Sequence, residues 1–165
     1  MIKLDYEKYK LAFLYLLNKM GKIEGKKKAF KMFYFLDFDF FEAYEKPFTG
    51  DTYIKKLMGP CPQYFESMAD ELEKDGLIVI KKERKNPEHE NDTVIYQLKG
   101  NKKINFKFST EEVKMLDRVA NIYGPQTGKD LENLSHTQAP WLAVGLNEEI
   151  PYELSYYRGS ESLTS

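Results

Sequence analysis

The residues that could carry catalysis or bind a metal are few in this chain and lie far apart in the sequence. Cys61 is the single cysteine, and His89 and His136 are the two histidines. A metal site needs several ligands at suitable spacing, which these three residues do not provide. An incidental divalent-cation site in the acidic loop around His89 is the weaker alternative. Cys61 with His136 as its base would make a nucleophile, but a small apolar residue in a turn between Pro60 and Pro62 is the favoured interpretation.

No other arrangement of side chains in the sequence indicates catalysis. Asp37 and Asp39 lie two positions apart in a predicted helix, where their side chains do not face each other. Gly21 and Gly25 lack the spacing and the preceding strand of a phosphate-binding loop. We therefore expect no enzymatic activity, no cofactor and no metal.

Composition narrows the class of protein. A chain of 165 residues with 42% hydrophobic and 31% charged residues predicts one soluble globular domain. Lys and Arg total 25 against 26 Asp and Glu, a balance that predicts no general attraction to nucleic acid or to an acidic membrane. One cysteine excludes an intrachain disulfide framework, and the N-terminal residues lack the apolar core of a signal peptide. We expect a cytoplasmic protein.

The stretch Lys26–Tyr44 organises the predicted fold. It holds eight of the 24 aromatic residues and is apolar on nearly all sides of a helix, which predicts a central helix surrounded by other elements. The charged residues Lys31, Asp37 and Asp39 interrupt this stretch, so we do not expect it to span a membrane.

The remaining pattern predicts a mainly α (α+β) fold: a compact helical domain over residues 5–155, with a winged-helix-like β-hairpin and a frayed tail at 156–165. Other helices are expected at Tyr6–Met20, from Pro62 in the first turn to Asp75, from the capping box at Ser109, and around Asp130–Leu134. Extended segments are expected at Tyr53–Leu57 and Phe106–Phe108, with hairpin strands at Leu77–Ile80 and Thr93–Leu98 joined by a polar loop, Lys81–Asp92.

This order of elements resembles a winged helix, in which residues 62–75 would take the place of the recognition helix. That segment carries five acidic residues against Lys74 alone, and the acids would repel a phosphate backbone. The hairpin carries a basic cluster, Lys81, Lys82, Arg84 and Lys85, which we interpret as a solvated edge. A DNA-binding regulator is therefore the weaker alternative, and nucleic acid is an unlikely partner.

Several short motifs occur together in a characteristic order: Thr49–Tyr53, Gly59-Pro60, Leu72–Leu77, Phe108-Ser109, and Ser135-His136 followed by Pro140-Trp141. In this order and spacing the chain resembles the Panacea domain, the SocA-like antitoxin domain, over about residues 5–155. Cys61 departs from the pattern, since an apolar residue is expected between the two prolines.

The resemblance implies the antitoxin of a type II toxin–antitoxin system, often carried by phages or other mobile elements. Members neutralise diverse toxins, many of which attack translation, including enzymes related to small alarmone synthetases. Neutralisation is usually direct binding, which implies a hetero-oligomer with the toxin and occlusion of its active site. In the SocA example the protein instead delivers its toxin to a Clp protease as an adaptor. The domain is not known as an enzyme.

Two sets of residues follow from this reading. The family motif comprises Thr49, Gly50, Asp51, Gly59, Pro60, Ser135, His136, Pro140 and Trp141, and we favour a structural role for them, with His136 and Trp141 holding a C-terminal helix to the core. The proposed partner contacts are the acidic outer face of the third helix and a tyrosine-rich C-terminal segment: Tyr64, Asp70, Glu71, Tyr152, Tyr156 and Tyr157.

Overall fold

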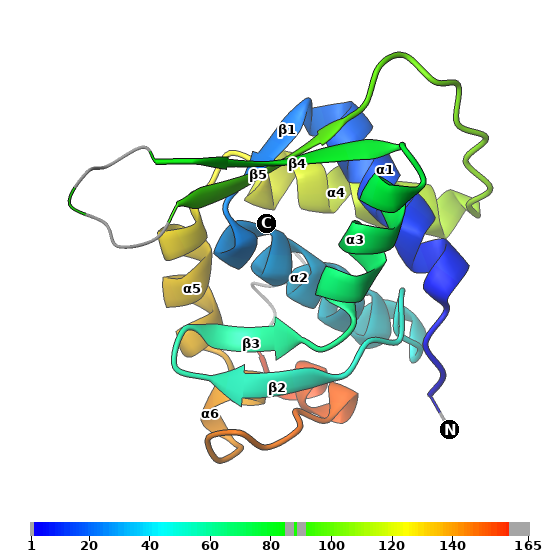
Figure 1. Ribbon diagram of the computed structural model, residues 1–165. Coiled ribbons are helices and arrows are strands. Elements are labelled where there is room, and N and C mark those ends of the chain that lie inside the picture. Colours follow the sequence, from blue (N-terminus) through cyan, green and yellow to red (C-terminus); the bar gives the residue numbers. More distant parts are fainter. Residues whose placement is uncertain (1, 85–87, 89–91, 159–165) are drawn as a thin grey trace.

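A computed structural model describes residues 2–84, 88 and 92–158 of the chain. Its helices and strands form an α+β fold, as the sequence predicts (Figure 1). In chain order the elements are α1 (Tyr6–Met20), β1 (Lys22–Glu24), α2 (Lys26–Tyr44), β2 (Tyr53–Lys56), β3 (Gly59–Pro62), α3 (Phe65–Lys74), β4 (Ile78–Glu83), β5 (Thr93–Leu98), α4 (Thr110–Tyr123), α5 (Gly128–His136), α6 (Ala139–Leu142) and the 3-10 helix η1 (Tyr152–Tyr157).

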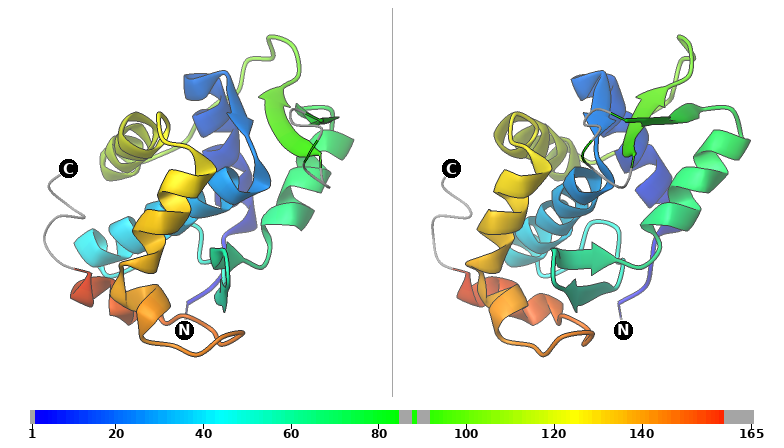
Figure 2. Two further views of the ribbon diagram at one scale, coloured as in Figure 1. Left: turned by 90° about the vertical axis from the view of Figure 1, so that its left-hand side faces the viewer. Right: turned by 60° about the vertical axis from the view of Figure 1, so that its left-hand side comes forward.

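The aromatic-rich helix α2 forms the centre of the fold, and its bounds match the predicted ones. Every residue from 31 to 40 is buried, because α4, α5, β3 and η1 all pack against the helix. Figure 2 shows α2 running between α5 on one side and α3 with the strands on the other. Phe33, Phe35 and Phe38 each contact aromatic rings of other elements, so the large rings of α2 supply much of the buried apolar area.

The predicted antiparallel hairpin is confirmed as β4 and β5, which pair from Ile78 with Leu98 to Glu83 with Thr93. The sequence analysis missed β1, which pairs with β5 and completes a three-stranded sheet in the order β1-β5-β4. A strand of three residues is too short to show the alternating pattern by which strands are recognised. Much of the predicted loop, including His89, lies outside the described residues.

Residues 53–62 form a second, two-stranded antiparallel hairpin, β2–β3. The extended segment predicted from Tyr53 is confirmed, but the expectation that Pro62 opens the third helix is wrong. Pro62 pairs with Tyr53 at the end of β3, and α3 begins at Phe65. The Asp51 carboxylate accepts a hydrogen bond from the Tyr64 backbone N–H, which holds the chain in a turn and delays the start of the helix.

Capping boxes open α4 and α5. Ser109 and Glu112 form the predicted box at the start of α4. Thr127 and Asp130 form a second box, which the sequence analysis missed, so α5 is longer at both ends than expected.

The segment between β5 and α4 contains no strand, contrary to the expectation for Phe106 and Phe108. Both rings instead pack edge-on against Tyr15 of α1, with centroids 5.2 and 5.9 Å away. Aromatic packing on a helix therefore takes the place of strand pairing here.

The C-terminal part of the described chain is the 3-10 helix η1, which packs against α2 and α6. Tyr156 and Tyr157, assigned by sequence to the tail, lie in its last turn. Arg158 follows and forms buried ion pairs with α2. Residues 159–165 of the expected tail lie outside the described residues.

Candidate functional site

The motif residues near position 50 form a buried hydrogen-bond network around Asp37 of α2. The Thr49 amide and hydroxyl donate to the Asp37 carboxylate at 2.5 and 2.6 Å, and the Tyr53 hydroxyl donates to it at 2.6 Å. Burial raises the pKa of Asp37 to about 6 against the opposing effect of these hydrogen bonds. Gly50 has φ +80°, and a side chain there would meet the backbone carbonyl of Lys3. These residues attach α2 to the chain that follows it.

Asp51 joins α1, the start of α3 and η1. Its carboxylate accepts hydrogen bonds from the Tyr9 hydroxyl at 2.6 Å and from the backbone N–H groups of Gln63 and Tyr64 at 3.0 and 3.1 Å. Its backbone carbonyl accepts from the Tyr152 hydroxyl at 2.5 Å. The structure corrects the expectation that Tyr152 contacts a partner, because the residue is only 7% exposed and packs in the core. The Thr-Gly-Asp motif is thus part of the framework of the fold.

A separate buried cluster surrounds Asp39, the second carboxylate in the apolar part of α2. Arg118 of α4 donates to Asp39 at 2.6 Å, and the Arg158 guanidinium lies 2.7 Å from its other oxygen. Arg158 also donates to Glu42 at 2.7 Å. Asp37 and Asp39 therefore belong to two different clusters.

Lys31 is a buried cation in the second turn of α2, and three motif residues surround it. It is 1% exposed, and its ammonium donates to the Pro60 carbonyl at 3.0 Å. Gly59 lies against it with φ +110°, and a Cβ there would stand 2.3 Å from Lys31 Cε and 2.9 Å from Ser135 Oγ. Burial lowers the pKa of Lys31 to about 8. Gly59, Pro60 and Ser135 therefore enclose one buried ammonium group.

The sequence analysis treated Lys31 only as an interruption of an apolar stretch. The predicted helix is apolar on nearly all sides, so no exposed face remained for this side chain. Lysine is almost never fully buried, so a lysine inside an all-round apolar helix is the sequence pattern that could have indicated a buried cation.

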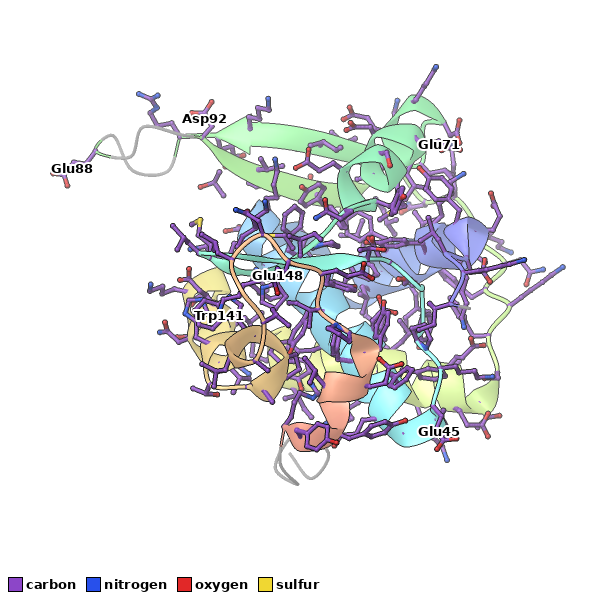
Figure 3. All side chains as sticks on the ribbon, turned by 90° about the horizontal axis from the view of Figure 1, so that it is seen from below. Glu45, Glu71, Glu88, Asp92, Trp141 and Glu148 are labelled. Carbon is purple, nitrogen blue, oxygen red and sulfur yellow. The ribbon has the colours of Figure 1, made fainter. Side chains whose placement is uncertain are left out.

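The last part of the motif joins α5 and α6 to β2. The rings of His136 and Trp141 stack with centroids 4.1 Å apart. The indole N–H of Trp141, which Figure 3 labels, donates to the Lys56 carbonyl at 2.9 Å. The Lys55 ammonium lies 4.0 Å from the centre of the indole ring. Pro140 is buried in α6. This arrangement fits the expectation that His136 and Trp141 hold the C-terminal helices to the rest of the fold.

Exposed apolar side chains lie beside this part of the motif. Leu57 and Met58 form the turn of the β2–β3 hairpin, and Leu142 and Leu146 lie at the end of α6 and in the loop after it. Leu57 is 75% exposed, and the other three are at least half exposed. Backbone hydrogen bonds join Lys55 of β2 to the loop after α6, so the two segments are held together. We call Leu57, Met58, Leu142 and Leu146 the corner patch.

The other proposed contact residues lie on two further surfaces. Tyr64 and Asp70 are exposed at the start and on the outer face of α3. Glu71 accepts a hydrogen bond from a lysine of α1 at 2.5 Å, so it is partly engaged within the chain. Tyr156 and Tyr157 are exposed at the end of η1.

Cys61 and His136 form no catalytic pair in the part of the chain that the structure describes. The Cys61 thiol donates to the Gly59 carbonyl at 3.5 Å, and His136 stacks on an indole ring. Burial raises the pKa of the Cys61 thiol, which is the opposite of the activation a nucleophile needs. Among the described residues, no group of His, Cys, Asp and Glu could hold a metal ion.

The chain matches a known family. Residues 30–142 match the family described as "Antitoxin SocA-like, Panacea domain", a range that runs from α2 to α6 and includes every motif residue named above. No curated protein and no solved structure matches the chain. Across residues 2–84, 88 and 92–158, no helix has the length and apolar character needed to cross a membrane.

Proposed function

The chain belongs to the SocA-like Panacea antitoxin family, and on this premise we propose that it neutralises a cognate protein toxin by binding it directly and occluding its active site. The observation that supports direct binding is the corner patch, an exposed apolar surface next to the motif residue Trp141, which bonds to the β2–β3 hairpin. The resemblance favours a toxin that attacks translation, in the manner of a small alarmone synthetase.

The corner patch has the physical properties of an interface centre. Single exposed apolar side chains are common, but several on neighbouring segments mark surfaces that a partner covers. Burying one leucine side chain stabilises a complex by about 1.5–3 kcal/mol. The hairpin and the loop after α6 are joined by backbone hydrogen bonds, so little conformational entropy is lost when a partner binds.

A second surface is kept as a candidate. Tyr64 and Asp70 on α3 present an aromatic ring and an acid to solvent, and such acids could occupy a basic pocket in which a toxin binds a phosphate-bearing substrate. Tyr156 and Tyr157 are a third, smaller surface.

Proteolytic delivery is the alternative mechanism. An adaptor would bring the toxin to a Clp protease, so the toxin would disappear from the cell, whereas occlusion leaves it abundant and inactive. A DNA-binding role is less favoured, because α3 carries its acids on exposed positions such as Glu66, Asp70 and Glu73.

The experiment is co-expression of this chain with the protein of the neighbouring reading frame, with growth and toxin level both measured. We expect wild-type chain to restore growth without lowering the toxin level. The double variant Leu57→Asp, Leu142→Asp should weaken the complex at least about 100-fold and abolish rescue. Ile2→Asp, which changes an exposed apolar residue elsewhere, is the matched control.

Three outcomes separate the alternatives. Full rescue by the double variant would exclude the corner patch as the interface. Loss of rescue in Asp70→Lys, Glu71→Lys instead would place the interface on α3. Rescue accompanied by disappearance of the toxin would favour the adaptor.

A further inference from the structure

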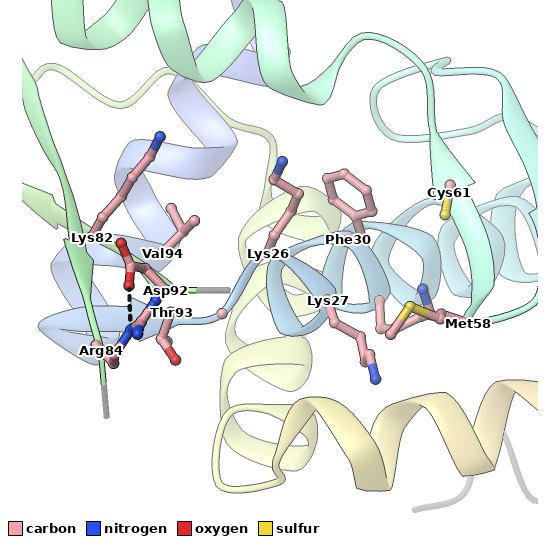
Figure 4. A pocket seen from close by; sticks show the side chains of 12 residues that line it. Lys26, Lys27, Phe30, Met58, Cys61, Lys82, Arg84, Asp92, Thr93 and Val94 are labelled. Atoms are coloured by element: carbon pink, nitrogen blue, oxygen red, sulfur yellow. Dashed lines mark hydrogen bonds and ion pairs between the residues drawn. The ribbon is translucent and has the colours of Figure 1, made fainter. Parts of the chain in front are cut away.

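A cleft of about 730 Å³ opens between the β4–β5 hairpin, the N-terminus of α2 and the β2–β3 hairpin. Segments far apart in the sequence line it, and Figure 4 shows Lys82, Arg84, Lys26 and Lys27 around it.

Positive charge dominates this cleft. Five lysine and arginine side chains line it, against the single carboxylate of Asp92. Arg84 pairs with Asp92 at 3.4 Å, an exposed contact that gives little stabilisation. Lys82 has no ion-pair or hydrogen-bond partner among the described residues, and the buried Lys31 donates only to a backbone carbonyl. Lys26 pairs with Glu66 at 2.9 Å and Lys27 with Glu132 at 3.5 Å, outside the lining. Lys82 and the buried Lys31 are therefore the cations of the lining that no carboxylate of the described residues pairs with.

The start of α2 adds a second source of positive potential. Gly25 precedes the first helical residue, Lys26, and its lack of a side chain leaves the helix N-terminus without a side-chain cap. The backbone N–H groups of a first helical turn have no partner within the helix, and the helix dipole favours an anion there. Lys31, one turn further on, is almost fully buried and also lines the cleft. A compact anion would meet backbone and side-chain donors together.

The cleft also has an apolar side. Phe30 is partly exposed and lies between Lys26 and the β3 strand, and Met58 and Val94 complete the apolar lining (Figure 4). Ligand sites of about 300–1,000 Å³ that combine apolar walls with a few polar groups are typical for small molecules.

We propose that this cleft binds a nucleotide-sized phosphate ester, with the phosphates between the α2 N-terminus and Lys82 and Arg84, and the apolar portion against Phe30, Met58 and Val94. A nucleic-acid strand fits less well, because a phosphodiester chain leaving the cleft along α3 would meet Glu66 and Asp70. This inference goes beyond the antitoxin role and concerns the isolated chain.

Isothermal titration calorimetry of the full chain without toxin tests the proposal. The probes are ATP, tripolyphosphate and adenosine. We expect ATP and tripolyphosphate to bind and adenosine to bind at least about tenfold more weakly than ATP, because the charged contacts provide most of the affinity.

A pair of variants on the hairpin locates the site. Lys82→Ala with Arg84→Ala should weaken ATP binding at least about tenfold. Lys81→Ala, which removes an exposed charge of the same strand outside the cleft lining, should leave it unchanged. Thermal unfolding checks that both variants remain folded.

The contrary results are equally specific. Absence of binding by ATP and by tripolyphosphate would overturn the proposal. An equal loss in the Lys81 variant would show a diffuse electrostatic effect instead of a site. Tighter binding of a short single-stranded oligonucleotide than of ATP would favour a nucleic-acid surface.

Discussion

Replacing Lys31 by methionine should stabilise the protein at neutral pH. Burial lowers the pKa of this lysine from 10.5 to about 8. At about 1.4 kcal/mol for each pH unit, the folded state carries a penalty of about 3 kcal/mol for its charged form. Methionine has a similar shape without the charge, but it leaves the Pro60 carbonyl without its donor, which costs about 1–3 kcal/mol. We expect a net gain of about 1 kcal/mol, or about 3 °C in Tm.

The pH dependence has a definite sign. Because the folded-state pKa of Lys31 lies below the unfolded-state value, the penalty is fully present below about pH 8 and is relieved as the pH rises toward 10.5. Between pH 7 and pH 10, the free energy of unfolding of the wild type should therefore rise by about 2–3 kcal/mol relative to that of Lys31→Met. Denaturant unfolding at several pH values, in a Cys61→Ser background, measures this difference without the thiol that interacts with Lys31.

Lys82→Met is the matched control. It removes an exposed lysine of the same cleft and should change the free energy of unfolding by less than about 0.5 kcal/mol. A marked destabilisation by Lys31→Met at pH 7, together with the same pH slope in both proteins, would refute the conclusion that the chain keeps this cation at a cost in stability.

Three further predictions concern the framework around α2. Gly59→Ala should lower the free energy of unfolding by at least about 2 kcal/mol, since φ +110° is strained for alanine and the new Cβ meets Lys31. An unchanged free energy of unfolding would contradict this prediction. A ¹³C titration of the Asp37 carboxyl should show a midpoint near pH 6. Because the folded-state pKa is raised, the free energy of unfolding should fall by about 3 kcal/mol as the pH rises from about 4 to 6. A midpoint below pH 4 would exclude the effect of burial on this pKa. Arg158→Ala should lower the free energy of unfolding in urea by about 3 kcal/mol, because the buried Asp39 carboxylate loses one of its two arginine partners. A decrease of less than about 1 kcal/mol would show that this ion pair contributes little to stability.

The sequence was sufficient to predict those helices whose bounds are determined by local patterns. The aromatic periodicity of Lys26–Tyr44 defined α2, and the Ser109 capping box defined α4, because these signals act within a few residues. The start of α3 was misplaced because Asp51, more than ten residues earlier, holds the backbone N–H of Tyr64. That contact is tertiary, so no local pattern indicates it.

The candidate surfaces were less accessible to sequence analysis. The family motif was found in order, but the convergence of Gly59, Pro60 and Ser135 on the Lys31 ammonium depends on α2, β3 and α5 packing together. The cleft combines residues from 25–31, 58–61, 82–84 and 92–94, so it depends on tertiary packing. The sequence alone indicated only a solvated edge for the basic cluster around Lys82. The corner patch likewise appears only when the β2–β3 turn meets the loop after α6.

The most direct test of the antitoxin role is a titration of the purified cognate toxin with the purified chain, in the toxin's own activity assay and without any protease. Direct occlusion predicts that toxin activity falls to zero at a fixed stoichiometric equivalence point, that the toxin stays intact, and that Leu57→Asp with Leu142→Asp removes the inhibition. Full toxin activity in the presence of excess chain would contradict occlusion.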